Sequence, residues 1–243
     1  MDLITFGLSK IRKTIPKQIL DIRYNIVKAT YSNVNMNIED IVIRGDVLID
    51  MNLVSCNQLV VKVSDLKYLG LYGDKMIYDV PSILTNGLAI MDVIAVIGEQ
   101  GFAVDKTVEA NIGIPSTTRV YLVNRHTISI DKEFFSATGG YVELTLAYDD
   151  RMKEIMPVSY PDIAKAFILA TKADIYNELI IDLDEGALYY GHDIGSIKSK
   201  IEEYADTREL YDTYMDETVA RVLFMNSDDA MQDWITGLLP NSQ

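Results

Sequence analysis

Apolar residues near the start of the chain recur at three- and four-residue spacing, which places them on one face of a helix. They are Ile15, Ile19, Ile22 and Ile26. This pattern predicts a helix over residues 15–31, with Pro16 in the first turn, where its missing N–H leaves no helical hydrogen bond unmade. A second, short helix is predicted to begin at Asn37, because asparagine is a favoured N-cap residue.

After Gly45 the hydrophobic pattern changes to a period of two, which is typical of a strand. It predicts a strand over residues 47–53 and a turn at 55–58 into a second strand at 59–63, together a hairpin. Five further strands are predicted between Gly, Pro, Asn and Asp residues: 76–80, 89–97, 119–124, 127–130 and 141–148. Loops are predicted at residues 98–118, a stretch that contains 111–116, and at residues 137–140. This spacing predicts an antiparallel sheet or sandwich.

Helical spacing returns after Asp149. Ser159 and Asp162 have the spacing of a capping box, and a helix is predicted from there to about Ile181. A second helix is predicted over 194–225, at 1.5 Å per residue roughly 45 Å long, followed by a short segment over 231–238.

The predicted fold class is therefore α+β, with an N-terminal helix, an antiparallel β-sheet or sandwich core and a C-terminal long α-helical hairpin. The predicted domains are residues 1–148, the N-terminal helix plus the β-rich part, and residues 149–243, the helical hairpin region packed on it.

The composition is that of a globular protein and argues against disulfide-rich, zinc-binding and membrane-spanning classes. The chain has 243 residues, of which 49% are hydrophobic, so it can bury a sizeable core. Its single cysteine, Cys56, excludes an internal disulfide framework, and two histidines leave little material for a zinc site. The longest apolar run, 88–98, is too short to span a bilayer and carries Asp92, and the first residues lack a secretory pattern. We expect a chain made in the reducing cytoplasm that does not enter a membrane.

Charge is distributed unevenly. Residues 1–28 carry six basic and two acidic side chains, whereas residues 149–243 carry eight basic and twenty acidic ones, and the net charge is −14. Opposite patches steer association, so the N-terminus could dock on the acidic part of a neighbouring copy. The alternative is a solvated basic helix end. The net negative charge argues against wrapping nucleic acid, although DNA could still pass nearby.

The densest group of reactive side chains is IDLDEGALYYGHD, residues 181–193. If this stretch is aligned as a calcium loop that begins at Asp182, Ala187 occupies the position that requires a glycine, and Asp193 the position where a bidentate glutamate is expected. This alignment therefore fails. The frame that places Gly186 at the glycine position begins on an isoleucine. His192 beside Asp193 has no recognisable nucleophile to activate. Its glycines suit a helix end and a turn, which predicts a connector of the hairpin with solvated carboxylates.

Other motifs of catalysis or cofactor binding are absent. The sequence has no phosphate-binding loop, no dinucleotide-type glycine run and no His-Glu-x-x-His. His126 is expected to be a sheet residue, and Asp149-Asp150 and Asp228-Asp229 are placed at predicted helix starts, where the helix dipole favours carboxylates. We expect no catalytic residues, no metal and no cofactor. The alternative of another class is an acidic metal-dependent hydrolase that uses Asp182, Asp184, His192 and Asp193.

Tyrosine is abundant, with fifteen residues. Seven fall in the predicted helical hairpin: Tyr160, Tyr176, Tyr189, Tyr190, Tyr204, Tyr211 and Tyr214. About half of these are expected to line the core of the hairpin. Tyrosine is favoured at interfaces because it covers apolar area while its hydroxyl stays hydrogen-bonded. Tyr189 and Tyr190, in the predicted turn, are expected to contact another protein.

The order of segments resembles that of virion structural proteins from large contractile-tailed bacteriophages. The resemblance is carried by IPKQIL at 15–20, RGDVLIDMNLV at 44–54, the β-rich middle, and the tail from ADIYNELIID at 173–182 to SIK at 196–198. It is closest to neck, or head-to-tail connector, components. The resemblance implies a non-enzymatic protein that forms a closed homo-oligomeric ring around the channel through which DNA leaves the capsid.

The implied partners are other copies of the chain and neighbouring virion proteins such as portal, connector or tail proteins. DNA would pass through without sequence-specific binding. The implied location is the virion, and the host cytoplasm during assembly. The alternative placement is a baseplate or tail-terminator protein. The candidate subunit interface comprises Lys10, Arg12, Lys13, Lys17, Asp182, Asp184, Glu185, Tyr189, Tyr190 and His192.

Overall fold

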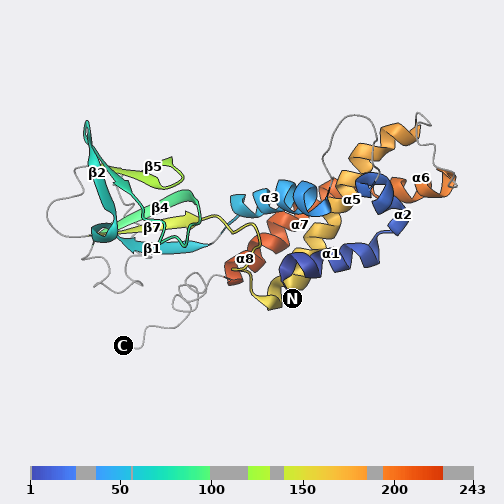
Figure 1. Cartoon of the computed structure of the whole chain (residues 1–243), viewed down its shortest axis with the longest axis horizontal. Helices are drawn as coiled ribbons and strands as arrows, with labels where there is room; N and C mark the ends of the chain where they lie inside the picture. The colour runs from blue at the N-terminus through green and yellow to red at the C-terminus, as the bar shows by residue number, and fades with distance from the viewer. Residues whose placement is uncertain are drawn as a thin grey trace. The chain divides into compact units, whose positions relative to one another are not determined.

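The chain folds into two compact units (Figure 1). The computed structural model describes residues 2–25, 37–55, 57–98, 120–131, 140–184 and 194–226. A helical unit comprises Met1–Val54 and Asp149–Leu223, and a β unit comprises Ser55–Tyr148 and Phe224–Gln243. The α+β fold class is confirmed. Residues 1–54, which the sequence grouped with the β-rich part, belong to the helical unit instead, because they pack against the helix that follows residue 159.

The helical unit is built around α5 (Tyr160–Asp184), which α1, η2, α6 and α7 all contact. The other helices are α1 (Leu3–Thr14), α2 (Lys17–Leu20), η1 (Asp21–Asn25), η2 (Glu39–Val47), α3 (Leu48–Leu53), η5 (Pro157–Ser159), α6 (Ile194–Glu202), α7 (Thr207–Tyr214), η6 (Met215–Val219) and α8 (Ala220–Asn226). Buried residues such as Ile163, Phe167 and Ile175 occur on several sides of α5. A helix that is apolar all round is typically the centre of its unit.

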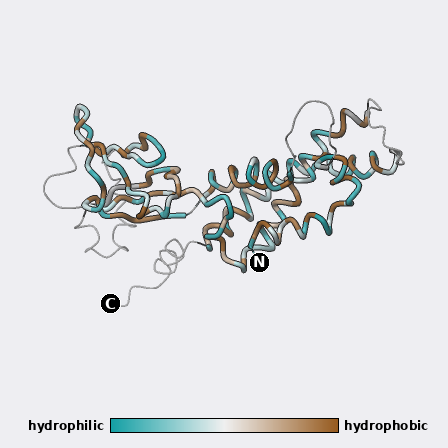
Figure 2. The backbone as a smooth tube through the Cα atoms, viewed as in Figure 1, coloured by the Kyte–Doolittle hydropathy of each residue, from teal (hydrophilic) through white to brown (hydrophobic). Residues whose placement is uncertain are grey.

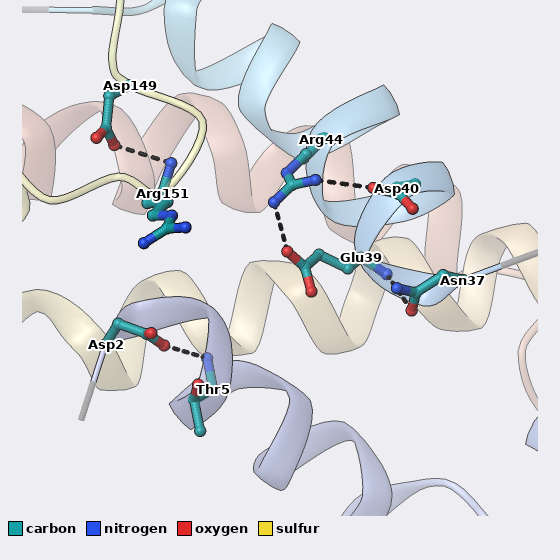
Figure 3. A network of polar contacts seen from close by, with 8 residues as sticks. All are labelled: Asp2, Thr5, Asn37, Glu39, Asp40, Arg44, Asp149 and Arg151. Atoms are coloured by element: carbon teal, nitrogen blue, oxygen red, sulfur yellow. Dashed lines mark hydrogen bonds and ion pairs between the residues drawn. The ribbon is translucent and has the colours of Figure 1, made fainter.

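The sequence did not predict α1. Asp2 caps this helix, since its Oδ1 accepts a hydrogen bond from the Thr5 N–H at 2.7 Å (Figure 3). The chain leaves the helical conformation at Ile15, which is extended, because Pro16 disfavours that conformation in the residue before it. The helix predicted from residue 15 therefore begins only at Lys17. Its predicted end, residue 31, lies outside the described residues.

The helix predicted from Asn37 is confirmed. The Asn37 Oδ1 accepts a hydrogen bond from the Glu39 N–H at 3.2 Å, and the Asn37 carbonyl accepts from the Asp40 and Ile41 N–H groups (Figure 3). In the same helix, Arg44 donates hydrogen bonds to Asp40 and Glu39. The Asn37 side chain thus satisfies a backbone donor that would otherwise be unpaired at the helix start.

The strand predicted over 47–53 is wrong, because η2 and α3 continue the helix to Leu53. A strand would have buried Ile49 and Leu53 together, but these are 54% and 75% exposed. Leu48 and Met51 are buried instead. The buried positions follow helical spacing, and the alternation along the sequence was coincidental.

The helical tail is confirmed in part. α5 begins directly after Ser159 and ends at Asp184, three residues beyond the predicted end. The single helix predicted over 194–225 is wrong, since turns at Glu203–Asp206 separate α6 from α7. Its apolar face is nevertheless continuous, and its buried members are Ile201, Tyr204, Tyr211, Met215, Val219 and Leu223. Asp149 lies in a turn, where its Oδ1 accepts from the Arg151 and Lys153 N–H groups, and not at a helix start.

The β unit holds two antiparallel sheets, as predicted. Their strands are β1 (Gln58–Lys62), β2 (Lys67–Tyr72), β3 (Lys75–Asp79), β4 (Ile90–Gly98), β5 (Val120–Asn124), β6 (Thr127–Asp131) and β7 (Gly140–Leu146). The three-stranded sheet has the order β1-β7-β4, and the four-stranded sheet has the order β2-β3-β6-β5. The predicted hairpin of 47–53 with 59–63 is wrong, because β1 pairs with β7. β2 was not predicted.

One hydrophobic core lies between the two sheets. It includes Val61, Val142 and Leu144 from the three-stranded sheet and Tyr78 and Ile128 from the four-stranded one. Figure 2 shows hydrophobic positions along strands of both sheets. His126, expected in a strand, is exposed in the turn between β5 and β6. The loops predicted at 99–118 and 137–139, Asp228-Asp229 and the segment at 231–238 lie outside the described residues.

Candidate functional site

The structure gathers the predicted basic residues on one exposed part of the helical unit. Lys10, Arg12 and Lys13 lie on α1 and Lys17 begins α2, and all four side chains are exposed. On the opposite face of α1, Leu3, Ile4, Gly7 and Ile11 are buried. The predicted basic patch is therefore a solvent-facing surface of α1 and α2.

The structure describes less of the acidic residues that were predicted to face this basic patch. Asp182 and Asp184 belong to the last turn of α5, but the placement of their side chains lies outside the description. Glu185, Tyr189, Tyr190 and His192 also lie outside the described residues, and so does Asp193. Their assignment to a subunit interface stays a prediction.

A second acidic set, which the sequence reading did not single out, lies between α6 and η6. Seven exposed carboxylates fall within residues 202–217: Glu202, Glu203, Asp206, Glu209, Asp212, Asp216 and Glu217. Lys200 pairs with Glu203 at 2.5 Å and Arg208 pairs with Asp212 at 3.2 Å. We call residues 202–217 the acidic face. The density of carboxylates in this segment is visible in the sequence and could have identified it.

A polar cluster is enclosed within the helical unit. The Arg23 guanidinium donates to both carboxylate oxygens of Asp174 at 3.0 Å, and the Tyr24 hydroxyl donates to Asp174 Oδ2 at 2.5 Å. The Arg23 and Asp174 side chains are only 10% and 12% exposed. Burial and the adjacent Asp174 charge raise the pKa of Tyr24, so that its hydroxyl stays a hydrogen-bond donor. Burial lowers the pKa of Arg23, but Asp174 reverses this and raises it overall.

A neighbouring part of this cluster lies between α3 and α7. The Tyr211 hydroxyl donates to Asp50 Oδ2 at 2.7 Å, and burial together with that bond raises the pKa of Tyr211. On η2, burial raises the pKa of Asp46, and the negative charge of Asp174 raises it further. Two of the participating segments, η1 and η2, are π-helical, a rare geometry. The hydrogen bonds join η1 to α5 and α7 to α3.

Asp46 gives this cluster a pH dependence. Its pKa is raised in the folded chain, so the ionised carboxylate destabilises the fold at every pH above the unfolded value of 3.8. Replacing Asp46 with asparagine is expected to raise the melting temperature at pH 7. The gain should shrink as the pH falls through the raised pKa of the wild-type Asp46 carboxyl, because protonation removes the buried charge. Thermal unfolding followed by circular dichroism at several pH values measures this, and a loss of stability at pH 7 would contradict it.

The arrangement offers no metal centre within the described ranges. Among residues 2–25, 37–55, 57–98, 120–131, 140–184 and 194–226, no group of three or more His, Cys, Asp or Glu side chains is placed to hold a metal ion. The buried carboxylates bind an arginine and two tyrosine hydroxyls instead. No helix in this described part is long and apolar enough to cross a membrane.

The β unit exposes an apolar strand. β2 is the outermost strand of its sheet, and Tyr68, Leu69, Leu71 and Tyr72 are 53%, 53%, 51% and 81% exposed. Tyr68 and Leu71 pair with Tyr78 and Met76, whose side chains belong to or pack against the core, so they share the inner face of the sheet. The described residues leave this part of the inner face about half uncovered.

Comparisons with known proteins give one family. A family model described as "Family of unknown function (DUF7484)" matches residues 1–113 and 103–241. The curated proteins gave no match, and neither did the solved structures.

Proposed function

The chain belongs to the DUF7484 family of unknown function, and we propose that it is a non-enzymatic structural subunit of a tailed-phage virion. In this proposal it forms a homo-oligomeric ring at the neck, the head-tail connection, around the DNA channel. Its partners are further copies of itself and the adjoining portal, connector or tail proteins. It is made in the host cytoplasm and ends in the virion.

The observation that carries an assembly role is the apolar surface of β2. Proteins that stay monomeric protect an outermost strand with charges, prolines or bulges, since its free N–H and C=O groups can pair with another chain. β2 has Lys67 and a bulge between Tyr68 and Gly70, yet four large apolar side chains remain exposed. Contiguous exposed apolar residues of this kind mark protein-protein contact surfaces.

The distribution of charge supports a ring in particular. A closed ring needs a heterologous interface, in which one patch meets a different patch on the next copy. The exposed basic residues of α1 and α2 and the acidic face are two such patches. An acidic protein also suits a DNA channel, because phosphate is repelled and the duplex can slide. The placement at the neck rests on the resemblance of segments 15–20, 44–54 and 173–198 to connector components.

The location is tested in purified particles of the phage that encodes the chain. We expect mass spectrometry to detect the chain in the particles, and averaged cryo-electron microscopy images to show it as a ring at the head-tail junction. A position at the baseplate or at the tail end would overturn the neck placement and favour the alternative sites. Absence from purified particles would overturn the virion role itself.

A further inference from the structure

We propose that the basic surface of α1 and α2 on one copy docks on the acidic face of the next copy. This inference rests on the proposed homo-oligomeric ring and names the interface that closes it. The second copy is the chosen occupant because each surface supplies the charge that the other lacks. The acidic surface in this interface is residues 202–217, whereas the interface role predicted for residues 182–192 stays a prediction.

The basic surface is exposed in the described part of one copy. Within the described ranges, no ion pair engages Lys10, Arg12, Lys13 or Lys17. Lys10 Nζ lies 5.2 Å from the centre of the Phe6 ring, a contact that positions the ammonium without neutralising it. The buried side of α1 faces α5, so these four cations point to solvent and not into their own unit.

The acidic face carries an excess of negative charge over the basic residues of the same segment. Arg208 is its only basic residue, against seven carboxylates. Lys200 and Arg208 engage Glu203 and Asp212. The other five carboxylates form no ion pair with the described part of the chain.

The acidic face also has an apolar centre. Leu210 lies among the carboxylates and is more than half exposed. Interfaces typically have such an apolar centre surrounded by polar residues. On the buried side of the same segment, Thr207 and Tyr211 anchor α7 in the helical unit. The exposed side chains are therefore presented from a fixed helix.

Two different patches of this kind produce a head-to-tail interface. Such an interface closes into a ring when the rotation between copies permits it. Contacts between exposed charges are screened by salt, with a Debye length of about 10 Å at 0.1 M and about 3 Å at 1 M. The assembly is therefore expected to be stronger at low ionic strength.

The test reverses each patch separately and then both together in the full chain. One variant carries Lys10→Glu, Lys13→Glu and Lys17→Glu, and the other carries Glu209→Lys, Asp216→Lys and Glu217→Lys. All six side chains are exposed, and none forms one of the ion pairs above. Native mass is measured by light scattering at 50 mM and 500 mM salt, and circular dichroism verifies folding.

Each single reversal is expected to weaken self-association by at least about 100-fold, because like charges then face each other across the interface. Mixing the two reversed chains, or combining all six changes, should restore association. The matched control carries Lys62→Glu, Arg125→Glu and Arg151→Glu, three exposed residues outside both patches and outside β2, and should assemble like the wild type. This control changes net charge by the same amount as the lysine reversal.

The outcomes separate this interface from the proposed ring. If the wild type assembles and both reversed variants keep its mass, the ring stands and this interface is wrong. If the control loses assembly as fully as the reversals do, the effect is one of net charge and the interface is again wrong. If the folded wild type stays monomeric at 50 mM salt, both alone and with the neighbouring virion proteins present, the interface and the ring are both overturned.

Discussion

Replacing Asp174 with asparagine is expected to lower the free energy of unfolding by about 3–5 kcal/mol, the usual cost of removing one partner from a buried ion pair. Asparagine keeps the shape of the side chain, so the packing around it changes little. The Arg23 guanidinium, only 10% exposed, would lose two hydrogen bonds to an ionised carboxylate, whereas its contact with the exposed Glu178 is longer, at 3.7 Å. Tyr24 would keep at best a neutral acceptor for its hydroxyl.

Urea unfolding followed by circular dichroism gives this free energy directly. The matched control is Glu203→Gln, which breaks the exposed pair with Lys200. Exposed ion pairs contribute about 0.2–1 kcal/mol, so the control should differ little from the wild type. Equal losses for the two variants would contradict the structural role assigned to the buried cluster.

Replacing Gly7 with alanine is expected to destabilise the helical unit, although glycine-to-alanine changes within helices usually stabilise. In an exposed helix interior this substitution stabilises by about 1 kcal/mol, because alanine is the better helix former. At Gly7 a Cβ atom would overlap Cδ2 of Phe167, a fully buried ring on α5. Forcing extra atoms into a packed core costs about 1–3 kcal/mol, so the clash outweighs the helical gain.

A double-mutant cycle identifies the cause. Phe167→Leu alone should destabilise by creating space, and Gly7→Ala combined with Phe167→Leu should cost less than the sum of the two single changes. Thermal and urea unfolding of the four chains provide the values. A stabilising Gly7→Ala, or strictly additive losses, would show that α1 does not approach α5 at this point.

The elements that the sequence predicted well are those in which local signals agree. Asn37 caps its helix by accepting a hydrogen bond from the Glu39 N–H, two residues away. α5 begins directly after Ser159, the last residue of the short helix that Pro157 starts. Strands β3 to β7 are separated by turn residues and carry apolar positions on the core face. Such features depend on neighbours in the sequence, and so they can be read from it.

The errors have a different physical origin, which is competition between local pattern and tertiary packing. Residues 47–53 alternate like a strand, but packing of Val47, Leu48 and Met51 within the helical unit selects a helix. The pairing of Arg23 with Asp174 joins positions 151 residues apart. Nothing local indicates that Arg23 is buried in an ion pair while Lys10, Arg12, Lys13 and Lys17 remain exposed.

The two surfaces of the proposed interface differ in how readily the sequence reveals them. The basic patch at Lys10, Arg12, Lys13 and Lys17 was found because its charges are adjacent in the sequence. The acidic face was missed because its carboxylates are distributed over α6, α7 and η6. The turns at Glu203–Asp206 separate two of these helices, but the apolar pattern continues across the turns and so does not reveal them.

The native mass of the purified chain, measured by light scattering across a range of concentrations, tests the proposed ring most directly. The ring model predicts one closed species whose mass is an integer multiple of 27.3 kDa and does not grow once it is complete. Adding the neighbouring virion proteins should leave that number of copies unchanged. A mass of one chain at every concentration, with those proteins present as well as without them, would contradict it.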